Sequence, residues 1–302
     1  MKKKIFGVLV ILVSILIFFI FFQFIDIHSV LEVISTANIE ILILSTMPFI
    51  ISLFLQAKRW QIILAGTGNH LPYFRCFSVM MAAFPLSSFT PSKSGDIIRS
   101  CYLRNCVPVS DTIGSVISER FLDLCVLLLF SFIGVVANRK HEFGLILFIS
   151  LLILIGGILF LCNLHRIPFK RFEFGRKISS VIKTLFSQKK VLSISAVLTI
   201  FIWLLAIIQT FLIFYSVNVF IPLLEMSANL PIAIFIGMIP VSLGGMGTRD
   251  VAILYLFSGF ATPAQLLSVG ILFSLFRYWL LAAAGLPFIK KATSYSTEES
   301  IL

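Results

Sequence analysis

Long stretches without a single charged residue are the feature that most constrains how this chain can fold. The clean ones are Ile5–Ile25, Ile41–Ala57, Phe143–Leu164 and Val191–Tyr215. About 20 apolar residues in a helix cross the hydrocarbon core of a bilayer. Because that core offers no partner to a free backbone N–H or C=O group, such stretches must satisfy their own hydrogen bonds as helices. We therefore predict an all-α polytopic membrane protein with about six to eight transmembrane helices.

Composition excludes two other classes of protein. The 302 residues are 59% hydrophobic and 12% charged, whereas a soluble domain is about a quarter charged. The net charge of +11 invites a nucleic-acid partner. However, the Lys and Arg residues lie between the apolar stretches, where membrane topology and anionic lipid account for them. We expect neither a water-soluble globule nor a nucleic-acid partner.

The sequence shows no sign of a metal, a cofactor or a disulfide. Its cysteines are Cys76, Cys101, Cys106, Cys125 and Cys162, an odd number without a CxxC pair, so we interpret them as small buried hydrophobic residues. There is no HExxH pattern and no phosphate-binding GxxxxGK[ST] loop. We expect no catalytic residue, no metal ligand and no cofactor.

The distribution of Lys and Arg predicts the orientation. Residues 165–190 are rich in both and hold one acid, Glu173, whereas residues 26–40 hold acids and neither Lys nor Arg. By the positive-inside rule the first loop is cytoplasmic and the second external. Lys290 and Lys291 place the carboxyl terminus inside as well, and Arg139-Lys140 is an exception that this topology places outside.

These observations lead us to predict a multi-pass protein of the cell membrane (plasma or inner membrane). We expect a retained anchor at 5–25, a single membrane domain over residues 1–291 and a short tail over 292–302, with both termini in the cytoplasm.

One face of the basic stretch is apolar. Phe174, Ile178, Val181, Ile182 and Leu185 share a helical face, which predicts a helix lying in the cytoplasmic interface. Capture of anionic headgroups and simple anchoring both remain open interpretations of this helix.

Two segments differ from ordinary spans. One runs from Phe84 to Arg99 and the other from Ile239 to Asp250, and each passes from proline through serine and glycine to an acid and an arginine. Proline and glycine disfavour a continuous helix, and such backbone is tolerated at membrane depth only inside protein or along a polar cavity. The flanking loops predict that the segments enter from opposite faces. An inverted repeat of the transporter type and a chance likeness both stay open.

Charges inside the apolar stretches mark a polar site. Ile113–Ala137 contains Glu119, Arg120 and Asp123, and Arg277 lies near the middle of Pro263–Pro287. A lone charge in hydrocarbon costs about 3 kcal/mol on insertion scales, so we expect the acids to pair with arginines. The candidates are Arg59, Arg99 and Arg249.

Arg277 has two interpretations. A guanidinium binds phosphate oxygens in a bidentate manner, which favours a lipid phosphate as its partner. The alternative is a structural ion pair with Asp250 or Asp123, and a pair that opens when a phosphate arrives combines the two.

These motifs together resemble the lysylphosphatidylglycerol synthase transmembrane-region family of flippase-like integral membrane proteins. The resemblance rests on Lys58-Arg59-Trp60, on Pro91 to Arg99, on Ser118 to Asp123 and on Pro240 to Asp250. The family more often has Glu where Asp96 and Asp250 stand here. The resemblance implies a membrane domain that moves a lipid between leaflets. The chain is expected to be a stand-alone form, because the aminoacyl-transferase domain of larger relatives does not follow Lys291.

The resemblance implies a flippase or transporter for an anionic phospholipid or a polyprenyl-phosphate-linked sugar. The alternatives are a membrane-embedded lipid- or glycosyl-transferase, with Glu119, Asp123 or Asp96 as base, and an accessory subunit that works with a lipid-modifying enzyme. The predicted transport site comprises Arg59, Pro91, Ser92, Gly95, Asp96, Arg99, Glu119, Arg120, Asp123, Pro240, Gly244, Gly245, Gly247, Arg249, Asp250 and Arg277.

Overall fold

Every regular element in the part of the chain that the structure describes is helical, which confirms the all-α prediction. The computed structural model describes residues 23, 25–137, 144, 148, 150–152, 155–157, 159, 173–238, 242 and 245–295. Within these residues three helical segments are long and apolar enough to cross a membrane: Ile39–Ala65, Lys189–Ser216 and Pro263–Ser294. The predicted spans Ile5–Ile25 and Phe143–Leu164 lie largely outside the described residues.

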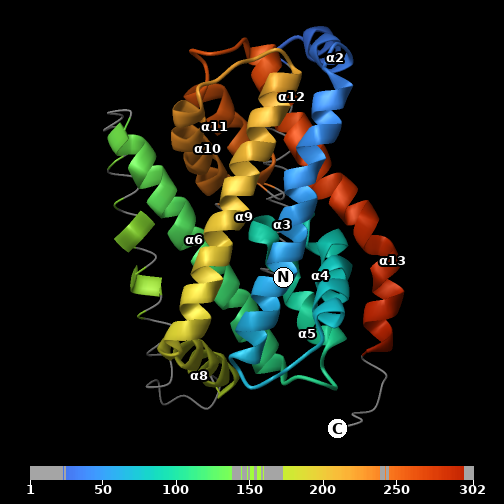
Figure 1. Ribbon diagram of the computed structural model, residues 1–302, viewed down its shortest axis with the longest axis vertical. Helices are drawn as coiled ribbons and strands as arrows, with labels where there is room; N and C mark the ends of the chain where they lie inside the picture. Colours follow the sequence, from blue (N-terminus) through green and yellow to red (C-terminus); the bar gives the residue numbers. More distant parts are fainter. Residues whose placement is uncertain are drawn as a thin grey trace.

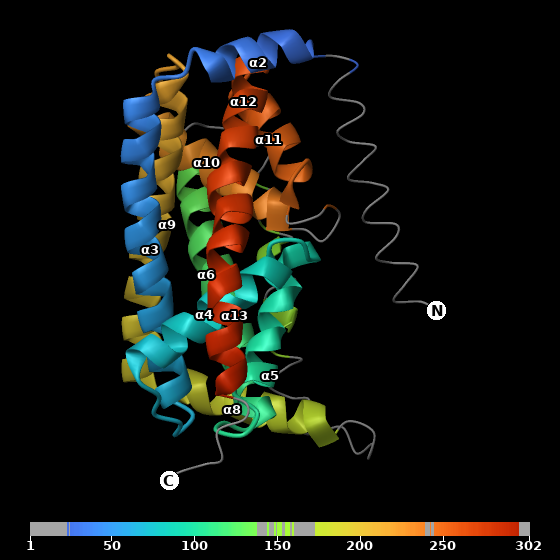
Figure 2. The same ribbon diagram turned by 90° about the vertical axis from the view of Figure 1, so that its right-hand side faces the viewer.

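The first half begins at the upper end of the bundle. Helix α2 (Ile27–Ser35) lies across this end, over the tops of the long helices (Figure 2). The long helix α3 (Ile39–Ala65) then descends, starting at Asn38, whose side chain accepts hydrogen bonds from the backbone N–H groups of Glu40 and Ile41. A short helix α4 (Tyr73–Ser87) follows, then the 3₁₀ segment η1 (Pro91–Ile98) and α5 (Arg99–Tyr102). The long helix α6 (Val109–Ala137) returns to the upper part.

The second half repeats this order from the lower end. Helix α8 (Glu173–Ser187) lies across the lower end, and the long helix α9 (Lys189–Ser216) ascends from it (Figure 1). The short helices α10 (Leu223–Met238) and α11 (Thr248–Leu256) follow. The chain then descends as one continuous helical segment made of α12 (Pro263–Ser274), the π-helical turn η6 (Leu275–Trp279) and α13 (Leu280–Ser294).

The two halves form an inverted repeat. Each contains a long helix, a short helix, a break, another short helix and a final long helix, and corresponding elements run in opposite directions (Figures 1 and 2). The long helices α3 and α9 pack along each other. The short helix of each half packs on the final helix of the other, α4 on α13 and α10 on α6. The short helices before the breaks, α4 and α10, enter from opposite ends of the bundle, as the sequence predicted for the broken segments (Figures 1 and 2).

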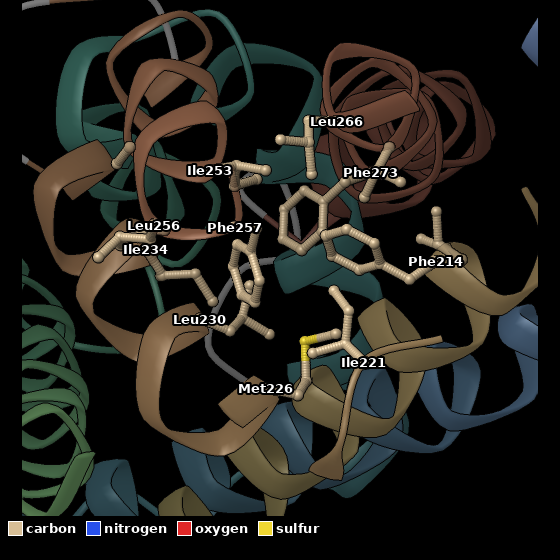
Figure 3. Packing of buried hydrophobic residues seen from close by; sticks show 14 of the residues in the cluster. Phe214, Ile221, Met226, Leu230, Ile234, Ile253, Leu256, Phe257, Leu266 and Phe273 are labelled. Carbon is tan, nitrogen blue, oxygen red and sulfur yellow. The ribbon is translucent and has the colours of Figure 1, made fainter. Parts of the chain in front are cut away.

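The upper and lower parts of the bundle each contain a hydrophobic cluster. The upper cluster joins α9, α10, α11 and α12 around Phe214, Leu230, Phe257 and Phe273 (Figure 3). The lower cluster joins α3, α4 and α13 around residues such as Trp60 and Leu281. Apolar side chains also cover the outside, where they suit contact with lipid.

Helix α8 has the amphipathic character that the sequence predicted. Ile182 and Leu185 are buried against the bundle, whereas Phe174 is exposed. Lys177 and Lys183 also lie exposed on this helix.

Candidate functional site

Three charged residues within little more than one turn of α6 form the centre of the site. Glu119 and Asp123 are only 1% and 3% exposed although they lie in a largely apolar helix. Four residues apart, they share one helical face. That face meets Arg59 on α3 and Arg99 at the start of α5, each 2% exposed.

Six charged side chains close into a ring, which we call the ion-pair ring. Its members are Arg59, Asp123, Arg120, Asp96, Arg99 and Glu119. Arg59 Nη1 lies 2.6 Å from Asp123 Oδ1, and Arg59 Nε lies 3.4 Å from Glu119 Oε1. Arg99 contacts Glu119 Oε2 at 2.7 Å and Asp96 Oδ1 at 3.4 Å. Arg120 contacts Asp96 Oδ2 at 2.6 Å and Asp123 Oδ2 at 3.3 Å. Equal numbers of guanidinium and carboxylate groups make the ring neutral.

Neighbouring helices hold the ring in place. On α9, Thr199 Oγ1 accepts a hydrogen bond from Arg59 Nη1 at 2.9 Å, and Trp203 Nε1 donates to Asp123 Oδ1 at 3.2 Å. The Arg99 guanidinium lies 4.8 Å from the centre of the Trp60 ring, a cation–π geometry. The ring therefore connects the first half of the repeat to α9 of the second.

A second charged pair stands at the start of α11. Arg249 Nε lies 2.9 Å from Asp250 Oδ1, and Arg249 Nη2 contacts the same oxygen. Arg249 Nη2 also donates to the carbonyl oxygen of Gly270 and to Ser274 Oγ on α12. Among the described residues, Arg249 Nη1 is buried and has no hydrogen-bond partner. Nη1 of Arg249 is therefore a donor without an acceptor among the described residues.

Arg277 lies on the π-helical turn η6 and contacts aromatic rings. Its guanidinium carbon is 5.7 Å from the centre of the Phe49 ring and 5.4 Å from that of Phe273. In the part of the chain that the structure describes it makes no ion pair. The predicted alternative, a pair with Asp250 or Asp123, is not formed, because Arg249 binds Asp250 while Arg59 and Arg120 bind Asp123.

One cavity brings these groups together. Arg59, Arg120 and Asp123 of the ion-pair ring line it, and so do Arg249 and Arg277. The rest of the wall is largely aromatic and aliphatic and comes from both hydrophobic clusters; it includes Phe49, Phe84, Ile234, Phe273 and Leu281. An apolar cavity with a few convergent charged groups is the usual form of a ligand site. This one has four arginines and one carboxylate in its lining, where residues of the two clusters meet.

The broken segments reach the site because glycine lets them fold back tightly. A Cβ atom on Gly95 would stand 2.7 Å from Ser87 Cα, on the end of α4. Gly245 occupies the equivalent place after α10, against Gly237, and its φ of +77° is a conformation that glycine adopts readily. Each turn delivers an acid and an arginine to the centre, Asp96 with Arg99 and Asp250 with Arg249.

Most predicted site residues that the structure describes lie at or next to the cavity. The pairing of Glu119 and Asp123 with Arg59 and Arg99 is present, whereas Arg249 pairs with its neighbour Asp250 instead. Gly247 precedes α11, and its backbone N–H donates to Asp250 Oδ2 at 3.1 Å. Pro91 and Ser92 begin η1, and Pro240 and Gly244 lie outside the described residues. A role of these residues in binding or transport stays a prediction.

Sequence reasoning missed several uncharged members of the site. Gln56, Trp203 and Tyr278 line the cavity. Gln56 stands three residues before Arg59, so the shared helical face of α3 was a signal that could have identified it. Trp203 and Tyr278 lie in apolar helices where an aromatic residue is ordinary, so no signal was present.

Comparison with known proteins places the chain among membrane proteins of related sequence. A family model described as "Lysylphosphatidylglycerol synthase TM region" matches residues 5–285. A "UPF0104 membrane protein" of Pyrococcus horikoshii is 21% identical, with 92% of this chain and 94% of the relative covered. Another of that description, from Methanocaldococcus jannaschii, is 24% identical over 85% of this chain and 86% of the relative. A third, from Methanothermobacter thermautotrophicus, is 30% identical over 36% of this chain and 33% of the relative.

Proposed function

This chain belongs to the lysylphosphatidylglycerol synthase TM region family, and on that premise we propose that it moves a lipid with an anionic headgroup between the two leaflets of a membrane. The cavity holds the headgroup while the acyl chains stay in the surrounding hydrocarbon. The observation that carries the proposal is a cavity lined by Arg59, Arg120, Arg249 and Arg277 where the two inverted halves meet.

The inverted repeat supplies a mechanism. Transporters with an inverted repeat alternate between two related conformations, because each half can adopt the arrangement of the other around a central site. Here η6 joins α12, whose Phe273 packs in the upper cluster, to α13, whose Leu281 packs in the lower one. A π-helical turn is a frequent feature of functional sites. Movement at η6 opens the cavity to one leaflet and then to the other.

The distribution of charge supports an orientation with the lower end in the cytoplasm. Of the described residues at the upper end, 25–40, 217–226 and 257–265 carry Asp26, Glu32, Glu40 and Glu225 and neither Lys nor Arg. The exception, Arg139-Lys140, lies outside the described residues. The lower end carries Lys189 and Lys190 at the start of α9 and Lys290 and Lys291 near the end of α13. Positively charged ends stay in the cytoplasm, so the headgroup is exchanged between the cytoplasmic leaflet and the outer one.

The carboxylates fit transport better than group transfer. A general base must be able to take up a proton. Asp96, Glu119, Asp123 and Asp250 each form an ion pair with at least one arginine of the protein, so each is already engaged by a partner other than a substrate.

Reconstitution in liposomes tests the proposal. Purified protein is placed in vesicles that contain fluorescent phosphatidylglycerol, and the fraction accessible to an external quencher is followed with time. The wild-type protein is expected to exchange label between leaflets, and Arg277→Ala, Arg249→Ala and Glu119→Gln to lose at least most of that exchange. Tyr255→Phe is a suitable control, because Tyr255 is 64% exposed on the outer surface of α11.

Two results would contradict lipid transport. Exchange no faster than in protein-free vesicles, with both anionic phospholipids and polyprenyl-phosphate sugars, would favour the transferase or the accessory subunit. Exchange that persists in all three charge variants would show that the cavity is not the path.

A further inference from the structure

The charges around the cavity do not cancel. The described arginines at the cavity and in the ion-pair ring are Arg59, Arg99, Arg120, Arg249 and Arg277, and the carboxylates are Asp96, Glu119, Asp123 and Asp250. The ring is neutral, and Arg249 with Asp250 is neutral. Five arginines against four carboxylates leave a net charge of +1, which belongs to Arg277.

Two separate groups at the cavity lack a protein partner for their donors. Arg277 makes no ion pair among the described residues and is held only by the rings of Phe49 and Phe273. Arg249 is 2% exposed, lines the same cavity and has one buried nitrogen, Nη1, without an acceptor. A buried donor without an acceptor is costly, so Arg249 Nη1 is suited to an oxygen of a bound anion. Arg277 is partly exposed, and its guanidinium carries a charge that an anion can balance. Guanidinium groups match phosphate oxygens in geometry as well as charge.

The sign and size of the ligand's charge decide whether the occupied cavity is neutral. In a low-dielectric cavity an unbalanced charge is expensive whether it comes from the protein or from the ligand. One negative charge brings the occupied site to neutrality. A second negative charge leaves an excess of −1, and a headgroup with a net positive charge raises the excess to +2 or more.

We infer that the site selects headgroups with a single net negative charge, namely phosphodiesters of an uncharged alcohol. This inference rests on the proposed function, since it concerns the cargo of the same cavity. It excludes phosphomonoesters and diphosphates, which carry more negative charge. It also excludes lipids whose alcohol carries ammonium groups and no carboxylate, because their net charge is zero or positive. Selection resides in Arg277 as the source of the uncompensated charge.

Equilibrium binding tests the inference without requiring transport. Protein in detergent is titrated with short-chain phosphatidylglycerol, phosphatidic acid, phosphatidylcholine and lysylphosphatidylglycerol, and Kd is measured from the fluorescence of Trp203, with Trp203→Phe to identify its signal. We expect phosphatidylglycerol to bind about tenfold or more tightly than the other three, since an unbalanced charge is costly away from water. Water-soluble glycerophosphoglycerol separates a lipid site from a site for free phosphodiesters and is expected to bind more weakly than the lipid.

Variants that change only the charge of the cavity provide the sharper test. Gln56 lines the cavity and is uncharged, so Gln56→Glu brings the net charge to zero and Gln56→Lys brings it to +2. Gln56→Glu and Arg277→Gln are expected to shift the preference to phosphatidylcholine, and Gln56→Lys to phosphatidic acid. The uncharged exchange Gln56→Met controls for loss of the amide and should keep the preference for phosphatidylglycerol.

The outcomes separate this inference from the proposed function. Equal affinity for lipids of every charge, or an order of preference that the Gln56 variants do not change, would overturn the inference even if the vesicles exchange lipid. Tighter binding of glycerophosphoglycerol than of the lipid would identify a soluble ligand. Selective binding with no exchange in vesicles would leave the charge selection standing and refute transport.

Discussion

Each carboxylate of the ion-pair ring contacts two arginines, and each arginine contacts two carboxylates. A closed ring of this kind distributes its charges evenly, so no guanidinium depends on a single partner. Burial of the separate ions would be costly, and the ring removes that cost only while it is complete. Glu119 is the member that joins Arg59 to Arg99, at 3.4 and 2.7 Å.

Replacement of Glu119 by Gln is therefore expected to destabilise the protein. Removing one partner from a buried pair costs about 3–5 kcal/mol, because the remaining charge is left uncompensated. The free energy of unfolding in denaturant-treated micelles measures the loss. The variant Glu119→Gln with Arg99→Gln removes a positive and a negative charge together, so its loss should be smaller than the sum of the two single losses. A single variant that unfolds like the wild type would show that the ring carries little stability.

Gln209 on α9 is a residue whose loss should stabilise the protein. Its side chain is fully buried, and neither amide atom has a hydrogen-bond partner among the described residues. An unpaired buried amide costs about 1–3 kcal/mol, so Gln209→Met, which keeps most of the volume, should raise the thermal midpoint in micelles. Thr210→Val on the same helix is the control. It removes a hydroxyl that donates to the carbonyl oxygen of Ala206 at 2.8 Å, and should not raise the midpoint.

At the scale of helices, close packing occurs at equivalent places in the two halves. On α6, a Cβ atom added to Gly134 would lie 2.5 Å from Ala228 Cα of α10. On α13, one added to Gly285 would lie 2.8 Å from Pro85 Cδ of α4. Small residues let helices approach closely in membranes. Glycine thus allows the short helix of each half to reach the final helix of the other.

Larger residues at these two positions should have the same effect in both halves. Gly134→Leu and Gly285→Leu are each expected to separate a short helix from its partner, since the added atoms meet backbone or a proline ring. Each should lower the thermal midpoint and reduce lipid exchange by about tenfold or more, as overpacking by several carbons costs about 1–3 kcal/mol or more. Ala284→Leu on α13 is a matched control, because Ala284 is exposed. A strong effect in one half only would argue that the halves are not functionally equivalent.

How far the sequence predicts this structure depends on how unusual a residue is in its surroundings. Charges such as Glu119 and Arg277 are conspicuous in apolar helices, and proline with glycine marked the broken segments, so the site and the repeat could be anticipated. The choice of partners could not, because it depends on how α3, α5 and α6 meet. A π-helical turn leaves no signal in an apolar sequence, and Trp203 resembles any aromatic residue in a span.

At the scale of the whole molecule, the two ends differ in charge although the halves are related by an inverted repeat. An inverted repeat alone would favour neither orientation, since each half fits the membrane equally well either way up. Among the described residues, lysines at the lower end and acids at the upper end favour the orientation with the lower end in the cytoplasm. Orientation is therefore a property of the loops and helix ends, separable from the helical core and from the cavity.

Cysteine labelling tests the orientation directly. Ser258, in the upper turn after α11, and Ser187, at the end of α8, are both exposed, so Ser258→Cys and Ser187→Cys should fold normally. In intact cells a membrane-impermeant maleimide is expected to label Cys at 258, and to label Cys at 187 only after the membrane is opened, because the proposed orientation places the basic end in the cytoplasm. Mass spectrometry of the peptides identifies the modified position, so the native cysteines can remain.

The reverse pattern would place the basic end outside, and labelling of both positions in intact cells would indicate a mixed orientation. Either result would require the direction of lipid exchange to be assigned anew, while the cavity and its charge selection would be unaffected.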